Sequence, residues 1–235
     1  MRLATFTPQS VVAIYAHPDD ADVAAGGVMS LWAEQGAQVH LVVVCDGAKG
    51  SHVASTDASD LAATRRRELQ QAADVMGLAS VHTLGYRDGE VTNSLELREQ
   101  LVRLLRLLTP QIVIGPDPTA TFFGGVYVNH RDHRETGWAL LDAVAPAVSM
   151  PLYFPDAGPA HVVETLLLSG THEPDVAVNI AAALERKVAA VVAHSSQMAG
   201  DEEGIAQVVR SRAAQAAHAV GASFAEAFRS VELAG

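Results

Sequence analysis

Cysteine, aromatic residues and long hydrophobic runs are all scarce in this chain. One cysteine, Cys45, stands in 235 residues, so no intrachain disulfide can form and nothing points to an oxidising compartment. The most apolar window, residues 137–155, contains an aspartate and three prolines, which exclude a membrane span. Residues 1–9 lack the apolar stretch of a secretory signal. We therefore expect a cytoplasmic protein.

Positive charge is also in short supply. The chain has 27 Asp and Glu against 16 Lys and Arg, for a net charge of -11 with histidine neutral. An acidic protein repels phosphate backbones and anionic lipids, so neither nucleic acid nor a membrane is expected as a partner. With 49% hydrophobic residues but only 5% aromatic ones, the core must consist mainly of Ala, Val and Leu. The length predicts one domain spanning residues 1–235.

Short apolar runs alternate with longer helical stretches along the chain. Gly36 and Gly77 are expected to end two helices, and Asn179 to cap a third. Strands are expected at 11–16, 38–44, 81–84, 111–115 and 162–168, and helices at 22–35, 61–76, 95–108, 132–145, 180–193 and 202–229, the last with Gly221 as a candidate break. This order predicts a Rossmann-like α/β sandwich with a mostly parallel sheet covered on both faces.

The predicted fold directs attention to the residues just after each strand, because ligands of such sheets bind beyond the carboxyl ends of the strands. No G-x-G-x-x-G pattern comes after the first strand, so nucleotide binding is not indicated. Small cytosolic α/β enzymes often assemble from identical copies, and we expect a homo-oligomer here.

A polar cluster, His17-Pro18-Asp19-Asp20, comes directly after the first predicted strand. An imidazole and a carboxylate three residues apart on a stiff turn can bind one metal ion, and a second carboxylate beside them can handle protons. The alternative is that Asp19 or Asp20 caps the next helix. The tetrapeptide alone leaves both interpretations open.

A second cluster, His130-Arg131-Asp132-His133, comes after the strand at 111–115 and its loop. Two clusters rich in His and Asp, each placed after a strand, are hard to explain by packing. Two histidines and one aspartate form a ligand set seen at catalytic metal sites, with a position left for water. Imidazole and carboxylate suit Zn²⁺, and Fe²⁺, Co²⁺ and Mn²⁺ are also compatible.

Further motifs complete a recognisable pattern. The chain resembles the LmbE-like, or PIG-L-like, N-deacetylases, a resemblance that runs from about residue 11 to 197. The matching motifs, in chain order, are Ala16-His17-Pro18-Asp19-Asp20, Asp46-Gly47-Ala48-Lys49-Gly50, Arg65 with Glu68, Leu84-Gly85-Tyr86-Arg87-Asp88-Gly89, His130-Arg131-Asp132-His133, and Lys187, Ala190, His194, Ser196 and Gln197. Two departures, Ala21-Asp22 after the first motif and Arg131 in place of proline, touch none of the implied ligands.

The resemblance implies a role for each residue of the two clusters. The metal ligands would be His17, Asp20 and His133. Asp19 would be the general base that activates water at the metal. His130 would stabilise the oxyanion, and Asp132 would orient His130 from behind.

Three further residues are candidates for binding the substrate, each with a structural alternative. Arg65 can hold substrate oxygens or form a salt bridge. Asp88 can bind sugar hydroxyls or serve an Asp-Gly turn. His194 can line the site or cap the end of a helix.

The function that the resemblance implies is a zinc-dependent deacetylase, a hydrolase of C–N bonds in linear amides. Its substrate would be a small amino sugar of the N-acetylglucosamine type. One alternative is a metallohydrolase of another class, such as a phosphoesterase, which often needs two metals and several bridging carboxylates. Another is a non-catalytic module that binds a metal or a sugar, although binding alone does not need the spare carboxylate of Asp19.

Overall fold

A computed structural model describes residues 1–233 of the chain, and its centre is an eight-stranded sheet in the order β1-β9-β10-β8-β5-β2-β3-β4. Five neighbouring strands run parallel: β8 (Thr165–Ser169), β5 (Ile112–Pro116), β2 (Ser10–Tyr15), β3 (Gln38–Cys45) and β4 (Ser80–Tyr86). At the other edge, β10 (Ala225–Glu232) is antiparallel to β8 and to β9 (Val176–Asn179), and β1 (Arg2–Leu3) is parallel to β9. The predicted mostly parallel α/β sheet is confirmed.

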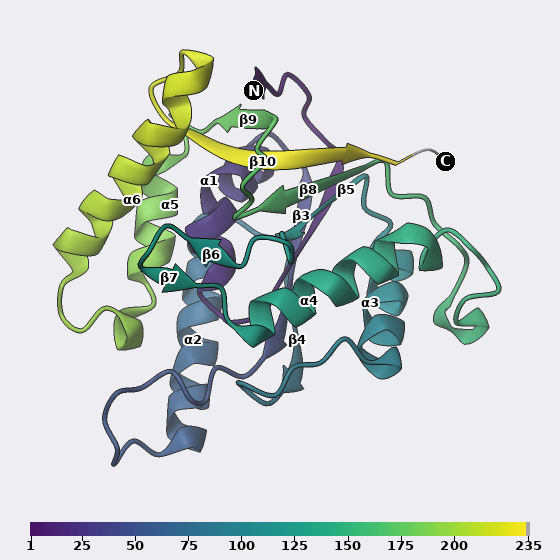
Figure 1. The fold of residues 1–235 in the computed structure, drawn as a ribbon, viewed down its shortest axis with the longest axis horizontal. Helices are drawn as coiled ribbons and strands as arrows, with labels where there is room; N and C mark the ends of the chain where they lie inside the picture. Colours follow the sequence, from purple (N-terminus) through teal and green to yellow (C-terminus); the bar gives the residue numbers. More distant parts are fainter. Residues whose placement is uncertain (234–235) are drawn as a thin grey trace.

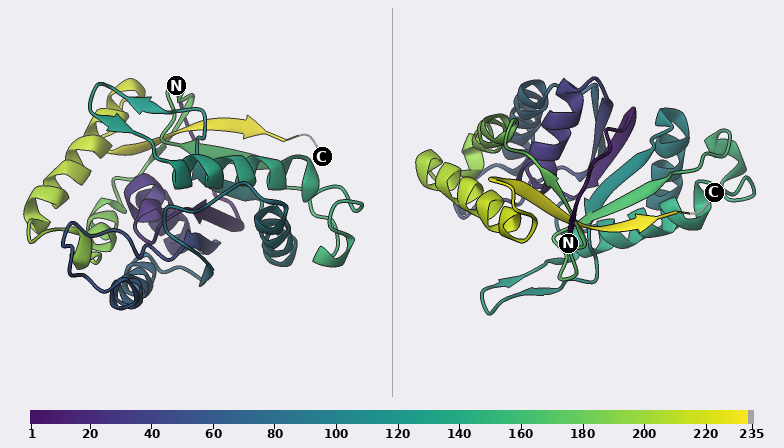
Figure 2. Two further views of the ribbon diagram at one scale, coloured as in Figure 1. Left: turned by 60° about the horizontal axis from the view of Figure 1, so that its bottom comes forward. Right: turned by 90° about the horizontal axis from the view of Figure 1, so that it is seen from above.

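Helices cover both faces of the sheet (Figures 1 and 2). Alternate residues of β2 point to opposite faces, so Val11 and Ala13 enter one hydrophobic cluster while Val12 and Ile14 enter the other. The first cluster is closed by helices that include α1 (Asp20–Glu34), α2 (Ala58–Met76), α5 (Leu184–Val192) and α6 (Glu202–Ala217). The second is closed by α3 (Leu95–Leu108) and α4 (Arg131–Asp142). Burial on both sides explains why the strands are continuously apolar.

Local capping chemistry sets several helix ends where the sequence predicts them. The carboxylate of Asp57 accepts hydrogen bonds from Ser59 and Asp60 at the start of α2, and Gly77 ends that helix with φ +73°. The hydroxyl of Ser94 accepts from the amide of Leu97 at the start of α3. The predicted helix at 95–108 is confirmed at both ends.

The C-terminal third differs from the prediction. The helix expected at 202–229 ends at Ala217, and the chain turns at Gly221 (φ +67°) before entering β10. The helix expected at 180–193 begins only at Leu184; its expected cap, Asn179, ends strand β9 and accepts a hydrogen bond from the amide of Ala181. The helix preference of the residues in β10 is overridden because this segment pairs with two neighbouring strands.

Smaller differences concern element boundaries and one hairpin. The strand expected at 162–168 is shorter (β8), and the helix expected at 132–145 gives way after Asp142 to a π-helical turn, Ala143–Ala147. A hairpin formed by β6 (Phe122–Phe123) and β7 (Tyr127–Val128) lies in the loop expected between the strand at 111–115 and the second cluster. Within residues 1–233, no helix combines the length and the apolar character needed to cross a membrane.

The loop after the π-helical turn is held by one buried guanidinium. Arg106 of α3 is 4% exposed, and no acid pairs with it among the described residues. Its nitrogens donate to six backbone carbonyls at 2.9–3.2 Å, those of Ala147, Val148, Met150, Tyr153, Phe154 and Gly158. The carbonyls of Val148, Met150 and Phe154 also accept from backbone amides, so the side chain adds to the hydrogen bonds that the loop backbone makes within itself and links its separate turns.

Arg106→Met is expected to lower the free energy of unfolding by about 2–4 kcal/mol, because buried carbonyls lose a charged donor. Urea titration followed by circular dichroism measures this. The control is Arg98→Met on the same helix, whose guanidinium is partly exposed and lies 3.5 Å from Asp142; we expect a loss of less than about 1 kcal/mol. Equal losses in the two variants would show that Arg106 does not organise the loop.

Candidate metal centre

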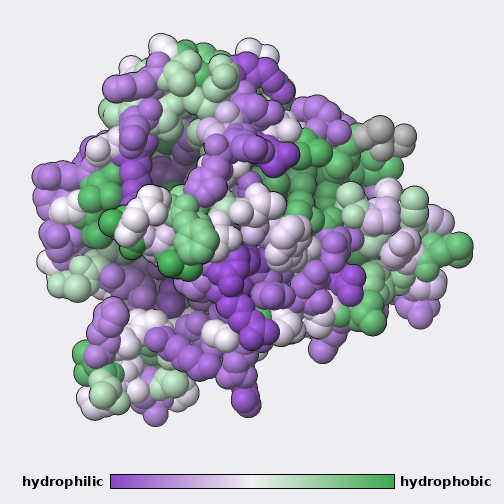
Figure 3. All heavy atoms as spheres, viewed as in Figure 1, coloured by the Kyte–Doolittle hydropathy of each residue, from purple (hydrophilic) through white to green (hydrophobic). Residues whose placement is uncertain are grey.

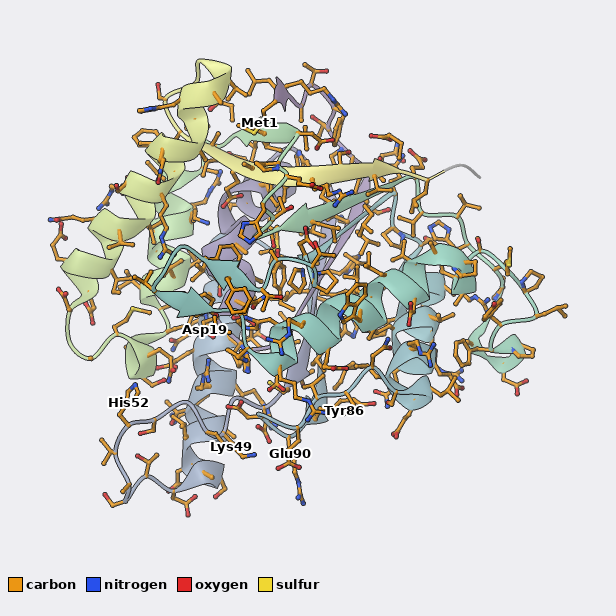
Figure 4. All side chains as sticks on the ribbon, viewed as in Figure 1. Met1, Asp19, Lys49, His52, Tyr86 and Glu90 are labelled. Carbon is orange, nitrogen blue, oxygen red and sulfur yellow. The ribbon has the colours of Figure 1, made fainter. Side chains whose placement is uncertain are left out.

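The polar clusters meet at the carboxyl edge of the parallel strands. β2 leads into His17 and Asp20, β3 into the loop at Asp46, and β4 into Asp88, while His133 lies in the first turn of α4. Figure 4 places Asp19 beside the β6–β7 hairpin, and shows Lys49 and Glu90, from two of these loops, next to each other. The expected convergence at this edge of the sheet is therefore present.

Three side chains bring ligand atoms to one point. Nδ1 of His17 lies 3.2 Å from Oδ2 of Asp20 and 3.1 Å from Nε2 of His133, and Nε2 of His133 lies 3.1 Å from Oδ1 of Asp20. Bonds of about 2.0–2.2 Å to one cation, at angles between octahedral and tetrahedral, separate neighbouring ligand atoms by about 3.0–3.4 Å. The triangle matches the dimensions of a divalent-metal site.

Hydrogen bonds on the far sides of the two rings decide which nitrogens can bind a cation. Nδ1 of His133 lies 2.9 Å from the amide oxygen of Asn129, which can only accept. Nε2 of His17 lies 3.4 Å from carboxylate oxygens of both Asp88 and Asp132. When the two rings are neutral, as they are in a metal complex, these nitrogens are the donors and the opposite nitrogens carry lone pairs directed at each other and at Asp20. A cation between them removes the repulsion and uses all three.

The electrostatic setting also favours a cation. Burial opposes a charge on His17, but the carboxylates of Asp20, Asp132 and Asp88 raise the pKa of its imidazole above the ordinary value. Burial likewise opposes ionisation of Asp20, yet the imidazoles of His133 and His17 keep its pKa well below the ordinary value. The hydrogen bond with His17 lowers the pKa of Asp88 to about 2. Several negative charges thus surround His17 at neutral pH.

A second group of potential ligands lies behind the first. A ring nitrogen of His17, the sulfur of Cys45 and oxygens of Asp88 and Asp132 all lie within 4.8 Å of one another. The carboxylate of Asp132 already accepts from the amides of Gly89 and Val91, and that of Asp88 accepts from the amide of Lys49. Burial also raises the pKa of the Cys45 thiol, which disfavours the thiolate that metals bind. The first group is the better metal site.

Asp19 is next to the metal triangle but does not belong to it. It stands at the N-cap position of α1, and its side chain makes no capping hydrogen bond. One of its oxygens instead lies 2.6 Å from Nη2 of Arg65. Because the carboxylate also lines the adjacent cavity, it can meet a molecule bound there.

Arg65 reaches Asp19 because two glycines leave it room. Its side chain is buried and also donates to the carbonyl of Gly47 at 3.0 Å. A Cβ atom at Gly47 or at Gly50 would come within 2.6 Å of Nη1 of the guanidinium. The Asp-Gly-x-x-Gly loop therefore packs closely against the guanidinium of Arg65, and Arg65 in turn holds the carboxylate of Asp19.

His130 lies over the two ligand histidines, and Asp132 lies beneath them. The ring centre of His130 is 4.0 Å from that of His133 and 5.0 Å from that of His17. Burial, with the neighbouring imidazoles, lowers the pKa of His130 below its ordinary value, which favours the neutral ring. Within residues 1–233, Asp132 makes no hydrogen bond to His130; it faces His17 instead. The expected support of His130 by Asp132 is thus replaced by support of His17.

A cavity of about 590 Å³ opens in front of the triangle, within the range of small-molecule sites. Figure 3 shows the surface hollowed beside the hairpin. The residues that line the cavity come from five parts of the chain: Tyr15, Asp19, Asp20, Val23, Ala24, Pro116, Asp117, Phe123, Val126, Tyr127, Asn129, His133, Ser169, Gly170 and Arg212. Asn129 had a signal in the sequence, an amide directly before the second cluster; Arg212 had none.

The three expected substrate contacts, Arg65, Asp88 and His194, are not among the described residues that line this cavity. His194 is fully buried, with Nε2 lying 2.7 Å from Oδ2 of Asp22. It is closed to a substrate here, and neither expected alternative, lining the site or capping a helix, describes its role. Motif spacing fixes a residue's position on a helix but not which neighbour its side chain meets.

The lysine of the C-terminal motif instead holds α1 in place. Nζ of Lys187 donates to the carbonyls of Asp22 and Val23 and lies 2.5 Å from Glu226. The carboxylate of Glu226 accepts from the amides of Gly27 and Val28 in the middle of α1. Both charged side chains are buried. The pair fixes the helix whose first turn carries Asp19 and Asp20.

Fold and site together define an α/β protein with a His/Asp centre of metal-binding geometry at the carboxyl edge of a parallel sheet. Residues 12–144 match the PIG-L family, described as GlcNAc-PI de-N-acetylase. The chain belongs to the PIG-L family.

Named relatives and a solved structure agree with this assignment. The structure of an N,N'-diacetylchitobiose deacetylase from Pyrococcus horikoshii, solved with an inhibitor, superposes on this chain with a TM-score of 0.87 at 30% sequence identity. The superposition covers 96% of this chain and 84% of the Pyrococcus chain. The diacetylchitobiose deacetylase of Thermococcus kodakarensis is 29% identical over 197 residues, 82% of this chain and 72% of the relative. A probable N-acetyl-alpha-D-glucosaminyl L-malate deacetylase of Bacillus anthracis is 26% identical over 201 residues, 80% of this chain and 81% of the relative.

Proposed function

We propose that this protein is a metal-dependent deacetylase that hydrolyses the acetamide of an N-acetylglucosamine-type conjugate. The observation that carries the proposal is the convergence of three lone-pair donors, from His17, Asp20 and His133, beside the separate carboxylate of Asp19 in an open cavity. The activities for which the relatives are named support the acetamide as the bond broken.

His17, Asp20 and His133 would hold the ion, with Zn²⁺ as the first candidate and Fe²⁺, Co²⁺ and Mn²⁺ as alternatives for nitrogen and oxygen donors. When bound, a divalent cation polarises the amide carbonyl and makes water more acidic. The chain's own second contribution is orientation, since Asn129 fixes the ring of His133 and Asp88 and Asp132 fix that of His17.

Asp19 takes the proton of the attacking water, whose oxygen forms a bond to the carbonyl carbon. Arg65 holds the carboxylate in place at 2.6 Å. The oxygen of the former carbonyl gains negative charge, and an N–H of neutral His130 donates to it. When the C–N bond breaks, the proton returns from Asp19 to the leaving nitrogen, so that water and amide become acetate and amine.

The alternative of a two-metal phosphoesterase is less well supported by the geometry. Two-metal sites hold their ions about 3.5–4 Å apart with bridging ligands. Here the two potential ligand groups share only His17, through opposite nitrogens of its ring, and an imidazole in that position keeps two ions further apart. A module that only binds would not need Asp19 facing the cavity beside the ligands.

The proposal is tested with the zinc-loaded protein and N-acetylated glycosides. We expect amine and acetate to appear in equal amounts from N,N'-diacetylchitobiose or N-acetylglucosaminyl L-malate. Activity should vanish on chelation and return with zinc. Hydrolysis of p-nitrophenyl phosphate without release of amine from any glycoside would favour the phosphoesterase instead.

A further inference from the structure

The face of α1 that carries Asp19 also carries a second carboxylate, which is fully buried. Asp22 comes one helical turn after Asp19, so the two side chains leave the helix on the same side. Oδ2 of Asp22 lies 2.7 Å from Nε2 of His194, whose side chain is also fully buried. The pair of Asp22 and His194 therefore lies inside the protein, close behind the carboxylate that faces the cavity.

Three polar atoms around this pair make no hydrogen bond within residues 1–233. They are Oδ1 of Asp22, Nδ1 of His194 and Nε of Arg65. Only six buried side-chain atoms of the described chain are unpaired in this way, so three of them in one region indicate a shared cause. Because an unpaired buried polar group is costly, we expect a bound molecule to supply the missing hydrogen bonds.

The unpaired nitrogen of Arg65 is turned toward α1. In a guanidinium, the Nε–H and one N–H of Nη2 point to the same side. Nη2 of Arg65 lies 2.6 Å from Asp19, so this side of the group faces the first turn of α1. Nη1 is held by the carbonyl of Gly47 at 3.0 Å. Nε is thus the one nitrogen of Arg65 that no described residue uses.

Helix α2 also fixes the segment that carries His194. Glu68 stands one turn after Arg65 on this helix. Its carboxylate accepts from the hydroxyl of Ser195 at 3.1 Å and from the hydroxyl and amide of Ser196 at 2.7 and 2.8 Å. Because Glu68 and Arg65 lie on one face of α2, these bonds hold the chain next to His194 against the face that carries the guanidinium.

Electrostatic interactions show the same proximity. Burial opposes a charge on the imidazole of His194. The carboxylates of Asp22, Asp19 and Glu68 nevertheless raise the pKa of this ring above the ordinary value. Carboxylates shift the pKa of an imidazole in this way when they lie near it. The acidic face of α1, the Arg65 face of α2 and the ring of His194 therefore meet where the three unpaired atoms lie.

A water molecule matches the chemistry of these three atoms. The Nε–H of Arg65 can only donate, and a carboxylate oxygen of Asp22 accepts. Nδ1 of His194 accepts when the ring is neutral and donates when it is protonated. Water has two hydrogens and two lone pairs, so it can serve all three atoms in either state of the ring. A metal cation could not accept from Arg65, and a simple anion could not donate to Asp22.

We propose that one buried water molecule bonds these three atoms and makes His194 a positioning residue for Asp19. Hydrogen bonds then run from the imidazole through the water to Nε of Arg65, and from Nη2 of Arg65 to the carboxylate. With all its nitrogens bonded, the guanidinium keeps one orientation and holds Asp19 toward the cavity. The positioning role rests on the proposed deacetylase function, whereas the water site does not.

High-resolution diffraction from the zinc-loaded wild-type protein tests the water site without turnover. We expect one water peak at about 2.7–3.2 Å from Nε of Arg65, Oδ1 of Asp22 and Nδ1 of His194. The absence of this peak, or a water that does not contact Arg65, overturns the proposal.

His194→Gln is the matched variant. Its amide nitrogen is as many bonds from Cα as Nε2 of histidine, so it can keep the bond to Asp22 but has no nitrogen in place of Nδ1. We expect kcat for amine release to fall by about 10-fold, with KM and zinc content within about 2-fold. The control is His161→Gln, whose Nε2 lies 2.8 Å from the carbonyl of Pro110 and which should keep kcat within about 2-fold.

A double-mutant cycle separates positioning from a merely structural role. Arg65→Lys keeps a positive charge beside Asp19 but has no nitrogen in place of Nε. In this background His194→Gln should lower kcat by less than about 2-fold, against about 10-fold in the wild type, because the link through the water is already broken. Equal losses in both backgrounds, or a loss that follows the zinc content, overturn the positioning role.

Diffraction from His194→Gln separates failure of this inference from failure of the proposed function. The carboxylate of Asp19 should move by about 0.5 Å or more relative to the wild type. If the wild type hydrolyses no glycoside but the water peak and this movement are seen, the deacetylase proposal fails and the link from His194 to Asp19 stands. An unmoved Asp19 overturns that link.

Discussion

Asp19→Asn is expected to lower kcat for amine release by about 10²–10⁴-fold, the range of a lost general base, while zinc stays bound. The substitution keeps the size of the side chain and an oxygen that can accept from Arg65, whose Nη2 lies 2.6 Å away. It removes the ability to take a proton. Steady-state kinetics and elemental analysis of the same preparation test both parts of the expectation.

The matched control for this variant is Asp60→Asn, an exposed position on α2 outside the cavity. It should retain kcat within about 2-fold, as surface substitutions usually do. Wild-type turnover in Asp19→Asn would remove Asp19 from the chemistry. Loss of zinc together with loss of activity would instead make Asp19 part of the metal site.

His133→Ala is expected to abolish both zinc binding and amine release. The imidazole supplies one corner of the ligand triangle, and the remaining two ligands leave the ion with fewer protein donors than catalytic zinc sites use. Elemental analysis after dialysis should fall from about one zinc per chain to nearly none. His218→Ala, on the turn after α6, is the control and should keep its zinc. A full zinc complement in His133→Ala would contradict the assigned ligand set.

Asn129→Ala provides a graded version of the same test. Its amide oxygen accepts from Nδ1 of His133 at 2.9 Å and so fixes the tautomer that points Nε2 at the ion. Loss of such a supporting partner typically weakens metal affinity by about 10–100-fold. Competition with a chromophoric chelator measures this. An affinity equal to that of the wild type would mean that the ring of His133 is oriented by other contacts.

The sequence predicted that the two polar clusters converge, because the determinants of their placement are local. His17 and Asp20 come after a strand whose apolar character fixes its end, and His133 begins a helix after another strand. The rule that ligands bind at the carboxyl ends of parallel strands then brings the two clusters together. The end of α2 at Gly77 was predicted for the same reason, because the residue that ends the helix stands next to it in the sequence.

The features that sequence reasoning missed depend on contacts between distant segments. Strand β10 is built from residues such as Ala225 and Phe228 without a strong preference for strands, and pairing with β8 and β9 decides its conformation. His194 stands in a motif, but only the fold shows that Asp22 receives it. Arg212 is a single arginine on a helix and becomes notable only beside the cavity. The predictions of a cytoplasmic homo-oligomer stay predictions.

Diffraction from zinc-loaded crystals, with data collected on both sides of the zinc absorption edge, tests the central claim most directly. We predict one strong anomalous peak between Nδ1 of His17, Nε2 of His133 and the carboxylate of Asp20, at about 2.0–2.2 Å from each. A peak at the other group, formed by a ring nitrogen of His17 with Cys45, Asp88 and Asp132, would contradict it. So would the absence of any peak at the carboxyl edge of the sheet.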